Sequence, residues 1–98
     1  MPALISVTNN LDTTYTLVFA AAVTWYSDGG ADLNSVMRSP GDNAWLPMQI
    51  QSQTDAVTIV AINTGFTDDA DTFVFLAPPA HLTAGDPFDV ATPTTPIS

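Results

Sequence analysis

The chain contains no glutamate and no lysine, so aspartate is its only acidic residue type. Glutamate and lysine are among the charged residues from which surface helices are usually built, and their absence argues against such helices. Threonine, valine and proline, which are frequent instead, favour strands and tight turns. We therefore predict an all-β fold, with helix in fewer than about a tenth of the residues.

Apolar and β-branched runs separated by turn residues predict several short strands. The expected strands cover residues 3–8, 14–26, 44–51, 56–63 and 72–77. Two of these runs, 14–26 and 56–63, are apolar on both faces, which is typical of strands inside a sheet. Pro47 has no amide hydrogen for a ladder, so its run is expected at a sheet edge. Residues 33–37 fit either one helical turn or a short strand.

The length of 98 residues is that of one domain with a modest core. Short strands at fairly regular spacing predict a small antiparallel β-sandwich or barrel, which we assign to residues 1–90. Residues 91–98 are rich in proline and threonine and show no apolar period. They predict an extended C-terminal tail.

The net charge of −9 comes from ten aspartates and a single arginine. A phosphate backbone is bound through clustered lysine and arginine, so direct contact with nucleic acid is not expected. An acidic inhibitor that mimics nucleic acid remains a third functional hypothesis. The longest apolar run, residues 17–25, is too short for a helix that crosses a bilayer. We therefore expect no membrane span, and no secretory signal is visible at Met1.

No catalytic motif stands out among the polar residues. His81 is the only histidine, and no Gly-x-Ser-x-Gly sequence accompanies it. Two aspartate pairs lie in loops and offer oxygen ligands for calcium, although neither has EF-hand spacing: Asp28 with Asp32, and Asp68 with Asp71. The sequence leaves calcium binding open. We predict a protein that is not an enzyme and needs no cofactor.

Only 11% of the residues are charged, well below the roughly 25% of an average soluble domain. A large share of the surface is therefore uncharged or covered by partners. Arg38 is the only strong cation, and we expect it to pair with an aspartate of the same chain.

Six residues are expected to bind partners. Trp45 follows a turn and Phe66 lies in an acidic loop, where aromatic rings suit an interface better than a core. Pro47 marks an expected free edge, and the tail prolines stiffen a segment that could dock on a neighbour. Ile97 is the only large apolar side chain of the tail. The predicted partner-binding residues are Trp45, Pro47, Phe66, Pro93, Pro96 and Ile97.

These features together predict a structural protein that works by assembly. We expect a virion component, such as a phage capsid decoration (cement) protein or a head or tail accessory protein. Its partners would be other copies of itself or a major capsid-type protein. The alternative is a secreted lectin-like or membrane-binding β-sandwich that uses its aromatic residues.

Overall fold

The computed structural model describes residues 4–25, 30–41, 44–65, 67–79, 81–85 and 95–96. Every regular element in these ranges is a β-strand, so the predicted all-β class is confirmed. No helix in the described residues could cross a membrane. The strands are β1 (Leu4–Asn9), β2 (Thr14–Phe19), β3 (Val23–Trp25), β4 (Asp32–Ser39), β5 (Ala44–Asp55), β6 (Thr58–Asn63), β7 (Thr72–Phe75), β8 (Leu82–Ala84) and β9 (Thr95–Pro96).

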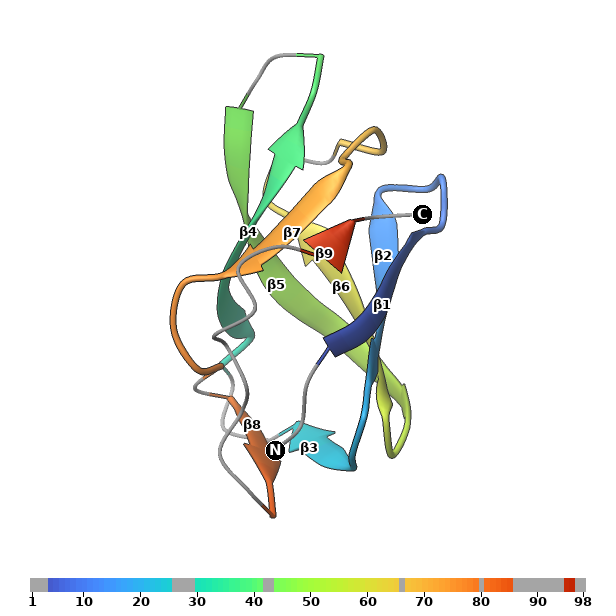
Figure 1. The fold of residues 1–98 in the computed structure, drawn as a ribbon, viewed down its shortest axis with the longest axis vertical. Helices are drawn as coiled ribbons and strands as arrows, with labels where there is room; N and C mark the ends of the chain where they lie inside the picture. The colour runs from blue at the N-terminus through green and yellow to red at the C-terminus, as the bar shows by residue number, and fades with distance from the viewer. Residues whose placement is uncertain are drawn as a thin grey trace.

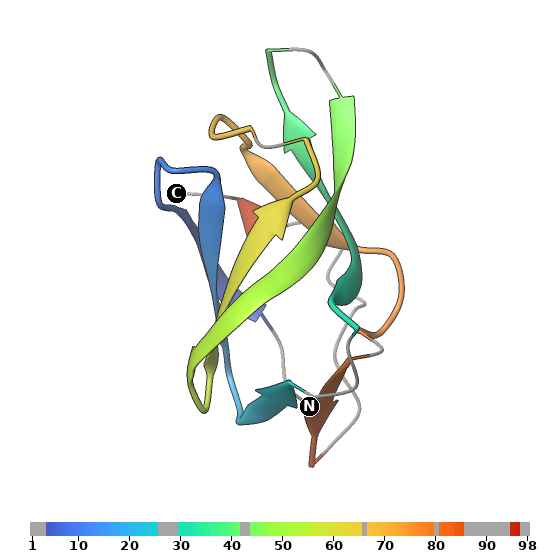
Figure 2. The ribbon, with the colours of Figure 1, turned by 180° about the vertical axis from the view of Figure 1, so that it is seen from behind.

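Seven strands form one antiparallel sheet in the order β1-β2-β6-β5-β4-β7-β9. The sheet curls until β9 touches β1, which gives a nearly closed barrel (Figure 1). The remaining strands, β3 and β8, pair with each other below it in the same view. Seen from behind, the long β5 crosses the molecule beside β6 (Figure 2). The predicted small antiparallel sandwich or barrel is therefore confirmed.

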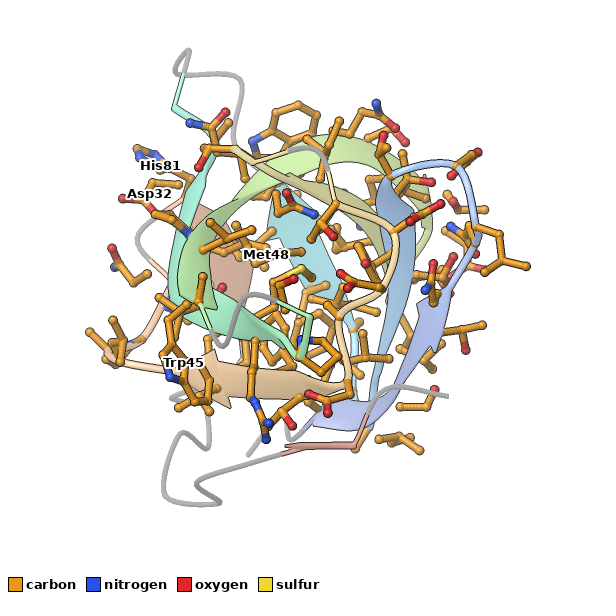
Figure 3. All side chains as sticks on the ribbon, turned by 90° about the horizontal axis from the view of Figure 1, so that it is seen from above. Asp32, Trp45, Met48 and His81 are labelled. Atoms are coloured by element: carbon orange, nitrogen blue, oxygen red, sulfur yellow. The ribbon has the colours of Figure 1, made fainter. Side chains whose placement is uncertain are left out.

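Successive side chains of a strand point alternately into the barrel and away from it, so every second residue contributes to the core. On β2 the inward residues are Tyr15, Leu17 and Phe19, and their neighbours Thr16 and Val18 are only half-buried. The strand β6 follows the same rule. Both strands lie inside the sheet, as their apolar runs predict, but only one face of each is fully buried. Figure 3, which looks down the barrel, shows Met48 inside it. The largest fully buried side chains are Tyr15, Phe19, Phe73, Leu17, Leu33, Met37, Met48, Ile59, Val7 and Asn63.

The single strand predicted over residues 14–26 is wrong, because the structure divides it into β2 and β3. The break falls at residues 20–22, three exposed alanines with no side chain large enough to anchor the run in the core. On either side of the break, the amides of Phe19 and Val23 donate to the carbonyls of Val57 and Ala56. The chain thereby leaves the large sheet and enters the small one. Residues 33–37, left open by the sequence, lie within the strand β4.

The predicted edge position of the Pro47 strand is also wrong. The strand β5 lies between β4 and β6, in the middle of the sheet. Pro47 is tolerated because it lies where β6 ends: its pairing with β5 begins at Met48 and Asn63. The Pro47 carbonyl accepts a hydrogen bond from the amide of Thr64, just past that end. In an antiparallel sheet the backbone nitrogen and oxygen of one residue point toward the same neighbouring strand. The nitrogen of Pro47 therefore faces the turn after β6, where no ladder hydrogen bond is lost.

Two residues of the predicted tail pair within their own chain. In β9, Thr95 and Pro96 lie opposite Phe73 and Thr72 of β7. A neighbouring copy is therefore not required to hold these two residues in place. Docking of the tail on a neighbour stays a prediction, and its expected anchors Pro93 and Ile97 lie outside the described residues.

Candidate partner-binding surface

The outer face of β4, β5 and β7 carries a cluster of apolar side chains. The strand register places Val36 opposite both Pro47 and Val74. Trp45 lies two residues before Pro47, on the same face of β5. Leu76 continues that face beyond β7, where its amide donates to the carbonyl of Asn34. We call Val36, Trp45, Pro47, Val74 and Leu76 the Trp45 patch.

The patch is hollowed and open to solvent. Val36, Trp45, Val74 and Leu76 line a depression of about 420 Å³. Trp45 is 49% exposed and Leu76 is 69% exposed, which is unusual for large apolar side chains. A contiguous exposed apolar surface of this kind marks a binding surface more often than a scattered apolar residue does.

Two of the six predicted partner-binding residues, Trp45 and Pro47, are neighbours in the patch. Pro96 lies in β9, which borders β7 on the side away from β4. Phe66, Pro93 and Ile97 lie outside the described residues. The sequence analysis missed Val36, Val74 and Leu76. A usable signal was present in residues 73–76, which are four consecutive large apolar residues. Successive side chains of a strand point to opposite faces of the sheet, so some of these four must lie on the outer face.

Arg38 stands at the border of the patch, opposite Trp45 on one side and Thr72 on the other. Its Nε is buried and has no hydrogen-bond partner among the described residues. Within those residues Arg38 forms no ion pair, so its expected pairing with an aspartate finds no support there. Asp71, whose amide donates to the Arg38 carbonyl, uses its carboxylate to accept a hydrogen bond from Thr72 Oγ1 at 3.0 Å.

A second cluster, at the end of the barrel where β6 passes into the following loop, is polar. Tyr15 is fully buried; its hydroxyl donates to the carbonyl of Thr67 at 3.1 Å and accepts from the amide of Ala70 at 3.2 Å. Asn63 Nδ2 also donates to the Thr67 carbonyl at 2.8 Å, and its Oδ1 accepts from the Thr67 amide at 3.0 Å. We call Tyr15, Ser39, Asn63, Thr67 and Asp69 the polar clamp.

The two titratable groups of the clamp, Tyr15 and Asp69, are engaged in hydrogen bonds that hold the loop to the barrel. Burial raises the pKa of Tyr15, and the nearby carboxylates of Asp69 and Asp68 act in the same direction. Hydrogen bonds from Thr67 and then Ser39 lower the pKa of Asp69, whose Oδ1 is 2.9 Å from Ser39 Oγ. Each side chain of the clamp thus has a partner within the loop or the barrel, as the buried members Tyr15, Ser39 and Asn63 require.

The loop aspartates give calcium no support in the described part of the chain. No group of three potential metal ligands occurs there. Asp32 Oδ1 instead accepts a hydrogen bond from the amide of Asn34 at 2.9 Å, and Asp28 lies outside the described residues.

The ring of His81 packs against the backbone of Gly30. The ring lies so close to Gly30 that a Cβ at that residue would be 1.9 Å from His81 Cε1. The Gly30 carbonyl also accepts a hydrogen bond from Trp25 Nε1 at 2.9 Å. Only glycine allows this approach, so the histidine ring and the indole together hold Gly30 in its place before β4.

The comparisons with known proteins identify the fold. No family model and no curated protein sequence matches the chain. Among solved structures, the chain is similar to the N-terminal part of the bacterial S-layer protein SbsC, with a TM-score of 0.64 and 18% identity. This match covers 99% of the chain and 23% of the SbsC part. A structure of SbsC domains 1–6 gives a TM-score of 0.65 and 19% identity over 99% of the chain and 13% of that structure.

A third structure, of a longer piece of the same S-layer protein, gives a TM-score of 0.65 at 19% identity and covers all of the chain. In each case this chain spans less than a quarter of the matched chain. At such low identity the likeness concerns the fold alone. The β-barrel described here has the fold of one part of a much larger bacterial surface-layer protein.

Proposed function

We propose that this chain is a non-catalytic assembly module of an ordered protein coat. The observation that carries the proposal is the Trp45 patch, an exposed apolar hollow built on three neighbouring strands of a rigid sheet. Interfaces between proteins are enriched in such aromatic anchors, and their centres are poor in charge. The shared fold with parts of SbsC supports the proposal, because a surface layer is itself a protein assembly.

The hollow suits a protein partner better than a sugar. Its four lining residues are Val36, Trp45, Val74 and Leu76, and none has a polar side chain beyond the indole nitrogen. Binding sites for polar ligands combine an aromatic surface with placed hydrogen-bonding groups. An apolar side chain of another protein fits this lining, and the lectin-like alternative receives no comparable support.

Two kinds of coat make the same demands on a module. A virion decoration protein and a cell-surface layer both need a compact domain that associates through its outer face. The fold likeness to a bacterial surface-layer protein supports a coat at the cell surface, and we propose that location. Co-sedimentation with bacterial cell envelopes and with phage heads separates the two, and binding to phage heads alone would favour the virion.

The experiment that tests assembly compares the wild-type chain with Trp45→Ser by sedimentation velocity. Protein concentrations up to about 1 mM allow detection of complexes whose free energy of association is as weak as about −4 kcal/mol. We expect concentration-dependent association of the wild-type chain and its loss in the variant. The matched control is Ile5→Ser, which removes another large apolar side chain, 63% exposed, from β1. Equal association of all three proteins would refute the assembly role of the patch.

A further inference from the structure

The turn between β1 and β2 presents an apolar side chain on a fixed backbone. Leu11 lies at its tip and is 76% exposed, the largest value among the exposed large apolar residues described. The Leu11 amide donates to Asn9 Oδ1 at 2.8 Å, and the Thr14 amide donates to Asp12 Oδ1 at 3.1 Å. The Asn10 side chain adds a bond to Thr16 Oγ1 at 3.0 Å. These bonds hold the tip in one shape.

Leucine is a poor choice for the backbone at this position. Leu11 has a φ of 62° and Thr13 has a φ of 74°, both in the left-handed region that disfavours side chains other than those of glycine, asparagine and aspartate. The leucine side chain also contributes little to the core, because it points into solvent. A strained, exposed apolar residue on a rigid turn indicates a contact with something outside the domain.

We propose that Leu11 of one copy inserts into the Trp45 patch of the next copy, so that the chains associate head to tail. This inference rests on the proposed assembly function and names the partner of the patch as a second copy of this chain. The hollow of about 420 Å³ has room for a leucine side chain. The lining of the hollow is apolar and so matches the apolar side chain of Leu11.

The charges next to the two features are complementary. Arg38, the only arginine in a chain of net charge −9, borders the hollow, and its buried Nε has no partner among the described residues. Asp12 is exposed and follows Leu11 directly. Insertion of the leucine therefore brings a carboxylate toward the one cation of the neighbouring copy. Elsewhere on the chain the surface charge is acidic and repels a second copy.

The two features lie on opposite sides of the barrel. In the sheet order, β6 separates β2 from the patch strand β5 on one side, and β9 separates β1 from the patch strand β7 on the other. Figure 3 shows Trp45 far from the strands β1 and β2, across the barrel. One copy cannot fill its own hollow, and the contact uses a different surface on each partner. Contacts of this type repeat from copy to copy and generate rings or open rows.

The first test is Leu11→Asn, measured by sedimentation equilibrium of the 98-residue chain. Asparagine tolerates a positive φ, so the variant should fold at least as well as the wild type. We expect its association to be at least about tenfold weaker, since an apolar side chain is withdrawn from the contact. The control Ile5→Asn, on the same hairpin but away from the tip, should associate as the wild type does.

The second test mixes Leu11→Asn, which keeps its hollow, with Trp45→Ser, which keeps its leucine. Each variant alone should remain a monomer, and an equimolar mixture should form dimers and nothing larger. A monomeric mixture would overturn the inference. If Leu11→Asn associates normally while Trp45→Ser does not, the patch binds another surface; the head-to-tail contact is then wrong and the assembly function stands. If neither variant affects association, both proposals fail.

Discussion

The polar clamp and the Trp45 patch are built from the same sheet but differ in how completely their groups are paired. In the clamp, Tyr15 and Asn63 are buried and bonded on both their donor and acceptor sides. In the patch, Trp45 and Leu76 are exposed, and the neighbouring Arg38 has a buried nitrogen without a partner among the described residues.

This difference separates stability from binding. A buried polar network that is complete stabilises one loop conformation, and removing one member leaves the others unpaired. An exposed apolar surface contributes little to folding and gains its free energy when a partner covers it. Substitutions in the clamp should therefore change the free energy of unfolding, whereas substitutions in the patch should change association.

The largest effect is expected for Asn63→Ala in the clamp. The substitution removes two hydrogen bonds to the Thr67 backbone and leaves a cavity at a position that is 1% exposed. Loss of the side chain and of its partners' hydrogen bonds should lower the free energy of unfolding by about 3 kcal/mol. Urea denaturation measures this change.

The control for this prediction is Thr64→Ala, at the exposed neighbouring position, which should cost less than about 0.5 kcal/mol. Equal losses in the two variants would mean that the clamp does not hold the loop, and the contrast between the two regions would disappear.

The next effect has the opposite sign. Arg38→Met keeps an unbranched apolar stem beside Trp45 and removes the buried Nε that lacks a partner. Since an unsatisfied buried donor costs about 1–3 kcal/mol, the free energy of unfolding should rise by about 1 kcal/mol. The denaturation is carried out in 0.5 M salt, where charges are screened beyond about 4 Å, so that the lost positive charge has little effect on stability. A decrease in stability would show that the arginine is paired within its own chain.

Much of the fold was predictable from the alternation of side chains. Tyr15, Leu17 and Phe19 face the core as their spacing predicts, and the expected strands over residues 56–63 and 72–77 correspond to β6 and β7. The break at residues 20–22 was not predictable, because alanines within an apolar run carry no turn signal. The position of Pro47 depended on where β6 ends, which is a tertiary property.

The candidate surface was predictable only in part. Trp45 and Pro47 were identified because an aromatic residue after a turn and a proline in a strand are unusual locally. Val36 and Val74 resemble ordinary strand residues, and only the register of three strands places them beside Trp45. Leu11 was missed for a similar reason: its 76% exposure and its positive φ became visible only in the structure.

A smaller effect is expected for Leu76→Ser in the patch. This side chain is 69% exposed and lines the hollow without entering the core. Its removal should change the free energy of unfolding by less than about 0.5 kcal/mol, as for most surface substitutions. Thermal unfolding of the dilute protein measures the change, with Phe73→Ser in the core as the contrasting variant. A large loss for Leu76→Ser would assign the patch to the fold and not to a partner.

The smallest effect concerns the exposed carboxylate of the clamp. Hydrogen bonds from Thr67 and Ser39 hold the pKa of Asp69 below its ordinary value of 3.8, so the folded state favours the ionised form. This contribution is fully present above the ordinary pKa and is lost as the pH falls through the lower value of the folded state. Stability should therefore decrease as the pH falls below the ordinary pKa of 3.8, and less steeply in Asp69→Asn.

Solvent screens an exposed group, so the difference between wild type and Asp69→Asn should be small and visible only in a full pH series of urea denaturation curves. The matched control is Asp68→Asn, which removes the same charge from the adjacent residue. Because Asp69 is the residue that accepts from Ser39 Oγ and Thr67 Oγ1, only its substitution should flatten the acid limb. If Asp68→Asn flattens the limb as much, relief of general charge repulsion explains the acid dependence, and the exposed end of the clamp adds nothing specific to stability.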